Sequence, residues 1–192
     1  MQSEQQAQFT SSAQTAYQML AQAVETLQAQ NGVVHTGPLD TGSNGNMLRN
    51  DFCNVLQCVS MDTTQNLTNG GINYYNYKSS SIAFNTASWN PLVAATILNN
   101  GIYLLWFHSY GNCTTGDPGT NACGYFMVDT NGTAGPNMLG DDMIQFMVVL
   151  NNGVYSILPA GAPGDSNNGT ACSIGSGLAC TYWRLFNPNG MP

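Results

Sequence analysis

The sequence predicts an α+β domain, in which one long N-terminal helix packs on an antiparallel β-sheet and disulfide bonds stabilise the loops. Two observations lead to this fold class. Apolar residues recur at helical spacing over residues 3–30, and from about residue 70 to 186 the chain consists of short aromatic and β-branched runs separated by turn-forming clusters. A helix followed by consecutive strands is the order typical of an α+β fold. With 192 residues, the chain 1–192 is expected to form a single domain.

The predicted N-terminal helix covers residues 3–30, where apolar side chains recur at steps of three and four between Gln, Ser and Thr. Asn31-Gly32 follows, and glycine readily adopts the left-handed conformation that commonly ends a helix. The face predicted to pack on the sheet consists of Phe9, Ala16, Leu20, Val24 and Leu27. Its small residues suit a helix that lies close against its neighbours.

A second helix is predicted over residues 47–59, and strands make up most of the chain beyond about residue 70. The predicted strands cover residues 72–77, 93–98, 102–110, 125–129, 143–150, 154–158 and 181–186. The turns Asn99-Asn100-Gly101 and Asn151-Asn152-Gly153 each separate two of these runs. Because Asn and Gly accept the positive φ of tight hairpin turns, both predict antiparallel neighbours.

The six cysteines fall into three pairs that are close in sequence, without a neighbouring histidine to complete a zinc site. The predicted disulfides are Cys53–Cys58, Cys113–Cys123 and Cys172–Cys180. Disulfides form in oxidising compartments, so we expect an exported protein.

The charge pattern argues against nucleic acid as a partner. Only three basic residues stand against ten acidic ones, and they form no basic stripe. The chain also contains no apolar run of the length that spans a bilayer.

Candidate catalytic residues are few, and we expect no enzymatic activity. His35 lies among turn-forming residues and His108 in a predicted strand, where a lone histidine is usually structural. The only dense carboxylate group is Asp129 with Asp141 and Asp142. A secreted hydrolase using these carboxylates is the less favoured hypothesis.

One segment carries a family resemblance. It contains Phe126-Met127-Val128-Asp129-Thr130-Asn131-Gly132, then Gly135-Pro136-Asn137, Gly140-Asp141-Asp142 and Ile144-Gln145-Phe146. The segment resembles the D-x-N-G, G-P-N and G-x-D pattern near the C-terminal sheet of type IV pilins and type II secretion pseudopilins. Together with the long helix, the resemblance covers residues 3–30 and roughly 90–160.

The resemblance implies a structural subunit of a bacterial type IV pilus or pilus-like filament: a major pilin, a minor pilin or a pseudopilin. Its partners would be other pilin subunits and, before assembly, the inner membrane. We expect the family's leader, processing site and apolar helix half to precede the present residues. The location would be an extracellular filament or the periplasm, with surface loops that serve adhesion or recognition.

The alternative is an exported carbohydrate-binding or adhesin module outside any filament. It rests on the disulfides, the low charge and the tyrosines Tyr74, Tyr75 and Tyr77, whose rings would stack on sugars if they were exposed.

The segment from Asp129 to Asp142 also suggests a calcium site, for which Asp129, Asn131 and Asp142 would supply oxygen ligands. Some pseudopilins bind calcium beside their C-terminal sheet. The competing interpretation is an Asx turn in which the same side chains only cap backbone amides. Apart from calcium, the sequence predicts no cofactor.

Overall fold

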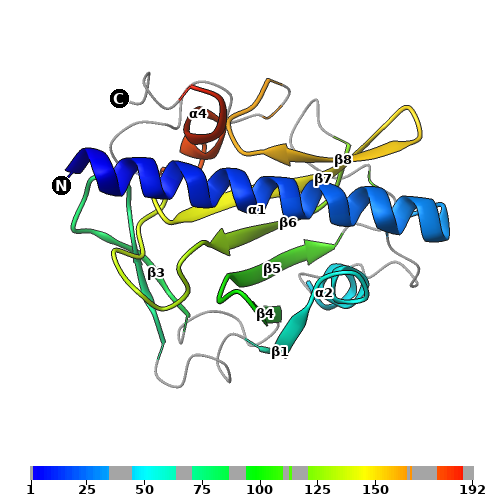
Figure 1. Ribbon diagram of the computed structural model, residues 1–192, viewed down its shortest axis with the longest axis horizontal. Helices are drawn as coiled ribbons and strands as arrows, with labels where there is room; N and C mark the ends of the chain where they lie inside the picture. The colour runs from blue at the N-terminus through cyan, green and yellow to red at the C-terminus, as the bar shows by residue number, and fades with distance from the viewer. Residues whose placement is uncertain are drawn as a thin grey trace.

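The protein has the predicted α+β architecture, with helix α1 (Gln2–Asn31) lying across an antiparallel sheet (Figure 1). The structure, a computed structural model, describes residues 2–34, 45–63, 71–86, 94–109, 113, 121–163, 165 and 177–187. The side chains of residues 2, 3, 63, 108 and 109 lie outside this description.

Helix α1 extends one residue beyond the prediction at each end, and its predicted packing face is buried. Gly32 follows with a φ of +72°, and its N–H donates to the carbonyl of Gln28 at 2.8 Å, which ends the helix as expected. Seven apolar residues of α1 are buried: Phe9, Ala13, Ala16, Leu20, Ala23, Val24 and Leu27. The helical spacing of these residues therefore predicted the buried face correctly.

The main sheet has six strands in the order β1-β4-β5-β6-β7-β8, all paired antiparallel. Its strands are β1 (Cys58–Thr63), β4 (Ala94–Leu98), β5 (Tyr103–Ser109), β6 (Ala122–Asp129), β7 (Met143–Asn151) and β8 (Val154–Pro159). Two further strands, β2 (Asn73–Tyr75) and β3 (Ile82–Asn85), form a separate hairpin.

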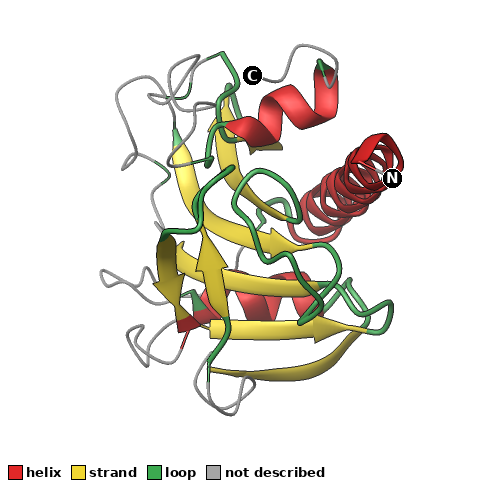
Figure 2. Cartoon of the chain, turned by 90° about the vertical axis from the view of Figure 1, so that its left-hand side faces the viewer, coloured by secondary structure: helices red, strands yellow, loops and turns green. Residues whose placement is uncertain are grey.

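The main sheet separates two layers, and α1 lies on one side of it (Figure 2). Strand β5 shows the alternation that produces this arrangement. Leu104 and Trp106 belong to the core cluster that includes α1 and α2 (Asn46–Cys53), whereas Tyr103 and Leu105 belong to a second cluster with residues of β2. The sheet is thus buried on both faces by different elements.

The hairpin between β7 and β8 confirms one turn prediction. Asn152 and Gly153 both have positive φ, +52° and +80°, between the paired residues Asn151 and Val154. Positive φ at both central residues is the requirement of a type I′ turn.

The prediction of a strand over residues 181–186 is wrong, because the segment forms helix α4 (Cys180–Phe186). Its buried residues are Cys180, Thr181, Arg184 and Leu185, whose spacing matches one face of a helix and not the alternation of a strand. A short apolar run cannot be assigned by composition alone.

The helix predicted over residues 47–59 is only partly correct. Helix α2 ends at Cys53, and the chain turns and begins the edge strand β1 at Cys58. In β1 the apolar side chains of Val59 and Met61 are exposed, so its burial pattern did not resemble that of a core strand.

No helix among the described residues is long and apolar enough to cross a membrane.

Candidate functional site

The segment that carries the family resemblance joins β6 to β7 and packs on β2. Asp129 is the last residue of β6, and Asp142 directly precedes β7. The N–H of Tyr75 donates to the carbonyl of Asn137 at 2.8 Å, and the N–H of Leu139 donates to the carbonyl of Tyr75 at 2.9 Å. The small hairpin therefore fixes the middle of this connection by backbone hydrogen bonds.

Asp129 is fully buried, and both of its carboxylate oxygens have partners. The Tyr74 hydroxyl donates to Oδ2 at 2.7 Å, and the backbone N–H of Asn131 donates to Oδ1 at 3.2 Å, which forms an Asx turn. Burial raises the pKa of Asp129 to about 8, and the nearby Asp142 adds to the rise. The hydrogen bonds from Tyr74 and the backbone oppose this rise only in part.

Asp142 is also fully buried and closes the other end of the connection. Its Oδ2 accepts from the N–H of Asn137 at 2.8 Å, and its Oδ1 accepts from the N–H of Met138 at 2.6 Å. Its carbonyl accepts from the N–H of Thr130 at 2.9 Å. Burial raises the pKa of Asp142, although the backbone N–H groups favour the ionised form.

Three buried oxygens at this connection have no hydrogen-bond partner among the described residues: Oδ1 of Asn131, Oδ1 of Asn137 and the hydroxyl of Tyr103. Asn131 uses its other side-chain atom, since Nδ2 donates to the carbonyl of Gly135 at 3.1 Å. Tyr103 is the cross-strand neighbour of Asp129.

The structure therefore brings Asp129, Asn131 and Asp142 into one connection, as both the calcium and the Asx-turn interpretations require. The described part of the chain contains no group of three or more His, Cys, Asp or Glu side chains able to hold a metal ion. Four carboxylate oxygens serve Tyr74 and backbone amides instead. The observed contacts are those of an Asx turn and its caps.

Arg184 of α4 is a central residue that the sequence analysis missed. It is 1% exposed, and its Nε and Nη2 donate to the carbonyl of Gly140 at 3.0 and 2.8 Å. Its Nη2 also pairs with Asp141, and its Nη1 donates to Oε1 of Gln6 at 2.5 Å. An arginine inside an apolar run was the signal for this role, because a buried guanidinium needs a carboxylate and carbonyl partners.

The three carboxylates considered for catalysis each have an internal partner. Asp129 bonds Tyr74, Asp141 pairs with Arg184, and Asp142 caps backbone amides. His35 and the side chain of His108 lie outside the described residues.

Two of the predicted disulfides are present, Cys53–Cys58 and Cys113–Cys123. Cys180 is also disulfide-bonded, and its predicted partner Cys172 lies outside the described residues.

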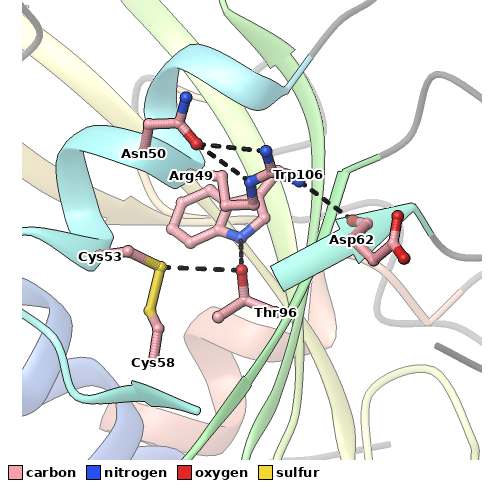
Figure 3. Close-up of a disulfide and its surroundings, with 7 residues drawn as sticks. All are labelled: Arg49, Asn50, Cys53, Cys58, Asp62, Thr96 and Trp106. Atoms are coloured by element: carbon pink, nitrogen blue, oxygen red, sulfur yellow. Dashed lines mark hydrogen bonds between the residues drawn. A yellow bond between two sulfur atoms is a disulfide. The ribbon is translucent and has the colours of Figure 1, made fainter. Parts of the chain in front are cut away.

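The first of these bonds links the end of α2 to the start of β1 (Figure 3). Beside it, Thr96 accepts a hydrogen bond from Nε1 of Trp106 at 3.1 Å, and its hydroxyl lies 3.9 Å from Sγ of Cys53. Arg49 of α2 reaches across to the carbonyl of Asp62 at 3.1 Å. The disulfide and the arginine thus hold β1 at the edge of the sheet.

The tyrosines considered for sugar stacking do not form an exposed platform. Tyr74 and Tyr77 are buried, at 0% and 2% exposure, and Tyr75 is half-buried. The Tyr74 hydroxyl donates its hydrogen bond to Asp129. The exposure that the carbohydrate-binding hypothesis assumed is therefore wrong for Tyr74 and Tyr77.

The chain matches no protein-family model, no curated protein and no solved structure.

Proposed function

We propose that the chain is the globular part of a structural subunit of a bacterial type IV pilus or pilus-like filament. One observation carries this proposal. A helix of 30 residues lies on a six-stranded antiparallel sheet and buries an apolar stripe from Phe9 to Leu27. This is the arrangement that the resemblance of the 126–146 segment implies.

A building role is also supported by how the polar groups are used. The three carboxylates of this segment, Asp129, Asp141 and Asp142, all make internal contacts. These contacts hold the β6–β7 connection, the β2–β3 hairpin and α4 together. Such contacts stabilise the fold. In this proposal the partners are further copies or related subunits, and the location is the bacterial envelope or an extracellular filament.

Immunogold electron microscopy tests the proposal, with antibodies raised against this domain and source cells that carry or lack the gene. We expect gold along thin filaments, or along the envelope where they assemble, in the parent cells only. Labelled protein that is free in the medium, with no filament in either strain, would contradict the proposal and favour an exported module.

Photo-crosslinking tests the subunit contacts in the same cells. A photoreactive amino acid replaces exposed Gln8 on α1 in one strain and exposed Asn152 in the β7–β8 hairpin in the other. We expect ladders of crosslinked copies from position 8 that exceed those from position 152, because the implied filament-forming segment precedes α1. Equal yields, or none at position 8, would contradict packing through this helix.

A further inference from the structure

Helix α1 is held by two different kinds of contact along its length. From Ala13 to Leu27 its buried residues belong to the main apolar cluster of the domain. Near its end, Nε2 of Gln28 donates to the carbonyl of Gly153 at 3.0 Å, and Oε1 of Gln28 accepts from the N–H of Tyr155 at 3.2 Å. This part of the helix is anchored by the core and by the β7–β8 hairpin.

The first three turns of α1 contact the body differently. Phe9 is their one buried apolar residue, and it belongs to none of the three apolar clusters that the described residues form. Its ring lies 5.9 Å from the guanidinium carbon of Arg184. The buried side chain at the start of α1 therefore packs against an arginine, whereas the buried side chains from Ala13 to Leu27 pack in the apolar core.

Gln6 completes this contact by bonding both members of the buried ion pair. Its Oε1 accepts from Nη1 of Arg184 at 2.5 Å, and its Nε2 lies 3.4 Å from Oδ1 of Asp141. Arg184 is fixed independently by the carbonyl of Gly140. The three side chains come from α1, the β6–β7 connection and α4, so they join the two ends of the described chain.

Hydrogen bonds to a buried charge are among the stronger polar contacts in proteins, but they depend on geometry and fail abruptly when one partner is lost. At the end of a longer helix, each further residue adds a propagation constant only near one, so end turns without tertiary contacts fray readily. The first turns of α1 thus need their contact with Arg184 and Asp141 to stay ordered. Residues 13–27 remain packed in the apolar core if that contact is lost.

We propose that Gln6, Asp141 and Arg184 form a polar latch, which docks residues 2–12 of α1 as a unit that opens separately from the rest of the fold. When the latch opens, the start of the helix leaves α4 while residues 13–27 remain packed on the sheet. The latch is a conformational device of this domain, and it does not depend on the filament proposal.

Amide hydrogen exchange on the whole domain tests the latch. Gln6→Ala removes the helix side of the latch, and Gln8→Ala is the matched control because Gln8 is exposed on the same turns. Alanine favours helix at both positions, so both variants should fold. We expect the amides of residues 6–12 to exchange about tenfold faster in Gln6→Ala than in Gln8→Ala.

Amides of residues 16–27 should show the same exchange in both variants. Asp141→Asn, which weakens the latch from the other side, should accelerate residues 6–12 as well. Unchanged exchange of residues 6–12 in Gln6→Ala would overturn the proposal. Equal acceleration of residues 6–12 and 16–27 would also overturn it, because α1 would then open as one unit.

Discussion

The two faces of the six-stranded sheet are stabilised by different chemistry. On the helical face, Phe126 lies between Trp106 and Phe146 with ring centroids 4.7 and 6.1 Å away, inside a continuous apolar cluster. On the opposite face, the buried carboxylates Asp129 and Asp142 lie beside an apolar cluster that contains Tyr74 and Tyr103.

The difference shows how each face tolerates change. An apolar core loses stability in proportion to the volume removed and accepts substitutions of similar size. A buried polar network depends on each partner, because a donor or acceptor left alone keeps its desolvation cost. The helical face should therefore respond to side-chain size and the opposite face to hydrogen-bonding capacity.

The largest effect is expected on the helical face. Phe126→Ala should lower the free energy of unfolding by about 3–5 kcal/mol, because the cavity opens among three other aromatic rings. Urea unfolding followed by circular dichroism measures the change. Phe126→Leu should cost less than half as much. Phe186→Ala, at an exposed position where the ring contacts only Tyr17 and Tyr182 among the described aromatic rings, should cost about 1 kcal/mol. If Phe126→Leu costs as much as Phe126→Ala, size does not govern this face.

On the opposite face, Asp142→Ala should lower the free energy of unfolding by about 2–3 kcal/mol, since the N–H groups of Asn137 and Met138 lose their acceptor. The same urea titration measures it. Asp142→Asn keeps one acceptor oxygen and should recover part of the loss, although its volume equals that of the native side chain. Equal losses in Asn and Ala variants would show that something other than acceptor number controls this face.

The helical face was largely predictable from the sequence, because its information is periodic. Helical spacing in α1 and alternation in the strands each identify which residues turn inward. The hairpin at Asn152-Gly153 was equally predictable, since its φ requirement is local.

The opposite face was less predictable, because its partners are distant in sequence. The side chain of Asp129 bonds Tyr74 across 55 positions. The contact between α1 and α4 was hidden for the same reason, since Arg184 bonds Gln6 across 178 positions. The motif around Asp129 and Asp142 identified where a polar site would lie but not which groups would complete it. Local patterns also failed at α4, where Arg184 interrupts an apolar run that resembled a strand.

The pH dependence of stability sharpens the comparison, because Asp129 and Asp142, whose pKa values are raised, both lie on the face opposite α1. The pKa of Asp129 is raised from its ordinary 3.8 to about 8, so between these values the folded protein holds a proton that the unfolded chain releases. This contribution to stability is complete below pH 3.8, declines as pH rises and is lost above about pH 8. The raised pKa of Asp142 acts in the same direction.

We therefore expect the free energy of unfolding to fall by about 1–2 kcal/mol between pH 7 and pH 9, because one proton changes it by about 1.4 kcal/mol per pH unit until Asp129 ionises. Urea titrations across this range measure the slope. Asp129→Asn should flatten it, whereas Glu25→Gln, at an exposed position on α1, should leave it unchanged. A slope of the opposite sign, or one that persists in Asp129→Asn, would assign the dependence to other groups.

The smallest effect concerns calcium, which decides between an Asx turn and a metal site at the same residues. Calcium binds with six or more oxygens, and the four carboxylate oxygens of Asp129 and Asp142 are already committed to Tyr74 and backbone amides. The buried side-chain oxygens near these carboxylates that lack partners among the described residues are the amide oxygens of Asn131 and Asn137 and the Tyr103 hydroxyl. We therefore expect excess calcium, and then chelator, to leave the melting temperature unchanged within about 1 °C, since a ligand that does not bind the folded state adds no stability.

The melts are run at pH 7 and pH 9, because Asp129 is largely ionised only above its pKa of about 8, and the ionised carboxylate binds a cation most strongly. Magnesium at the same ionic strength is the control. A rise with calcium alone that disappears in Asp142→Asn would establish the metal site and reverse this assignment.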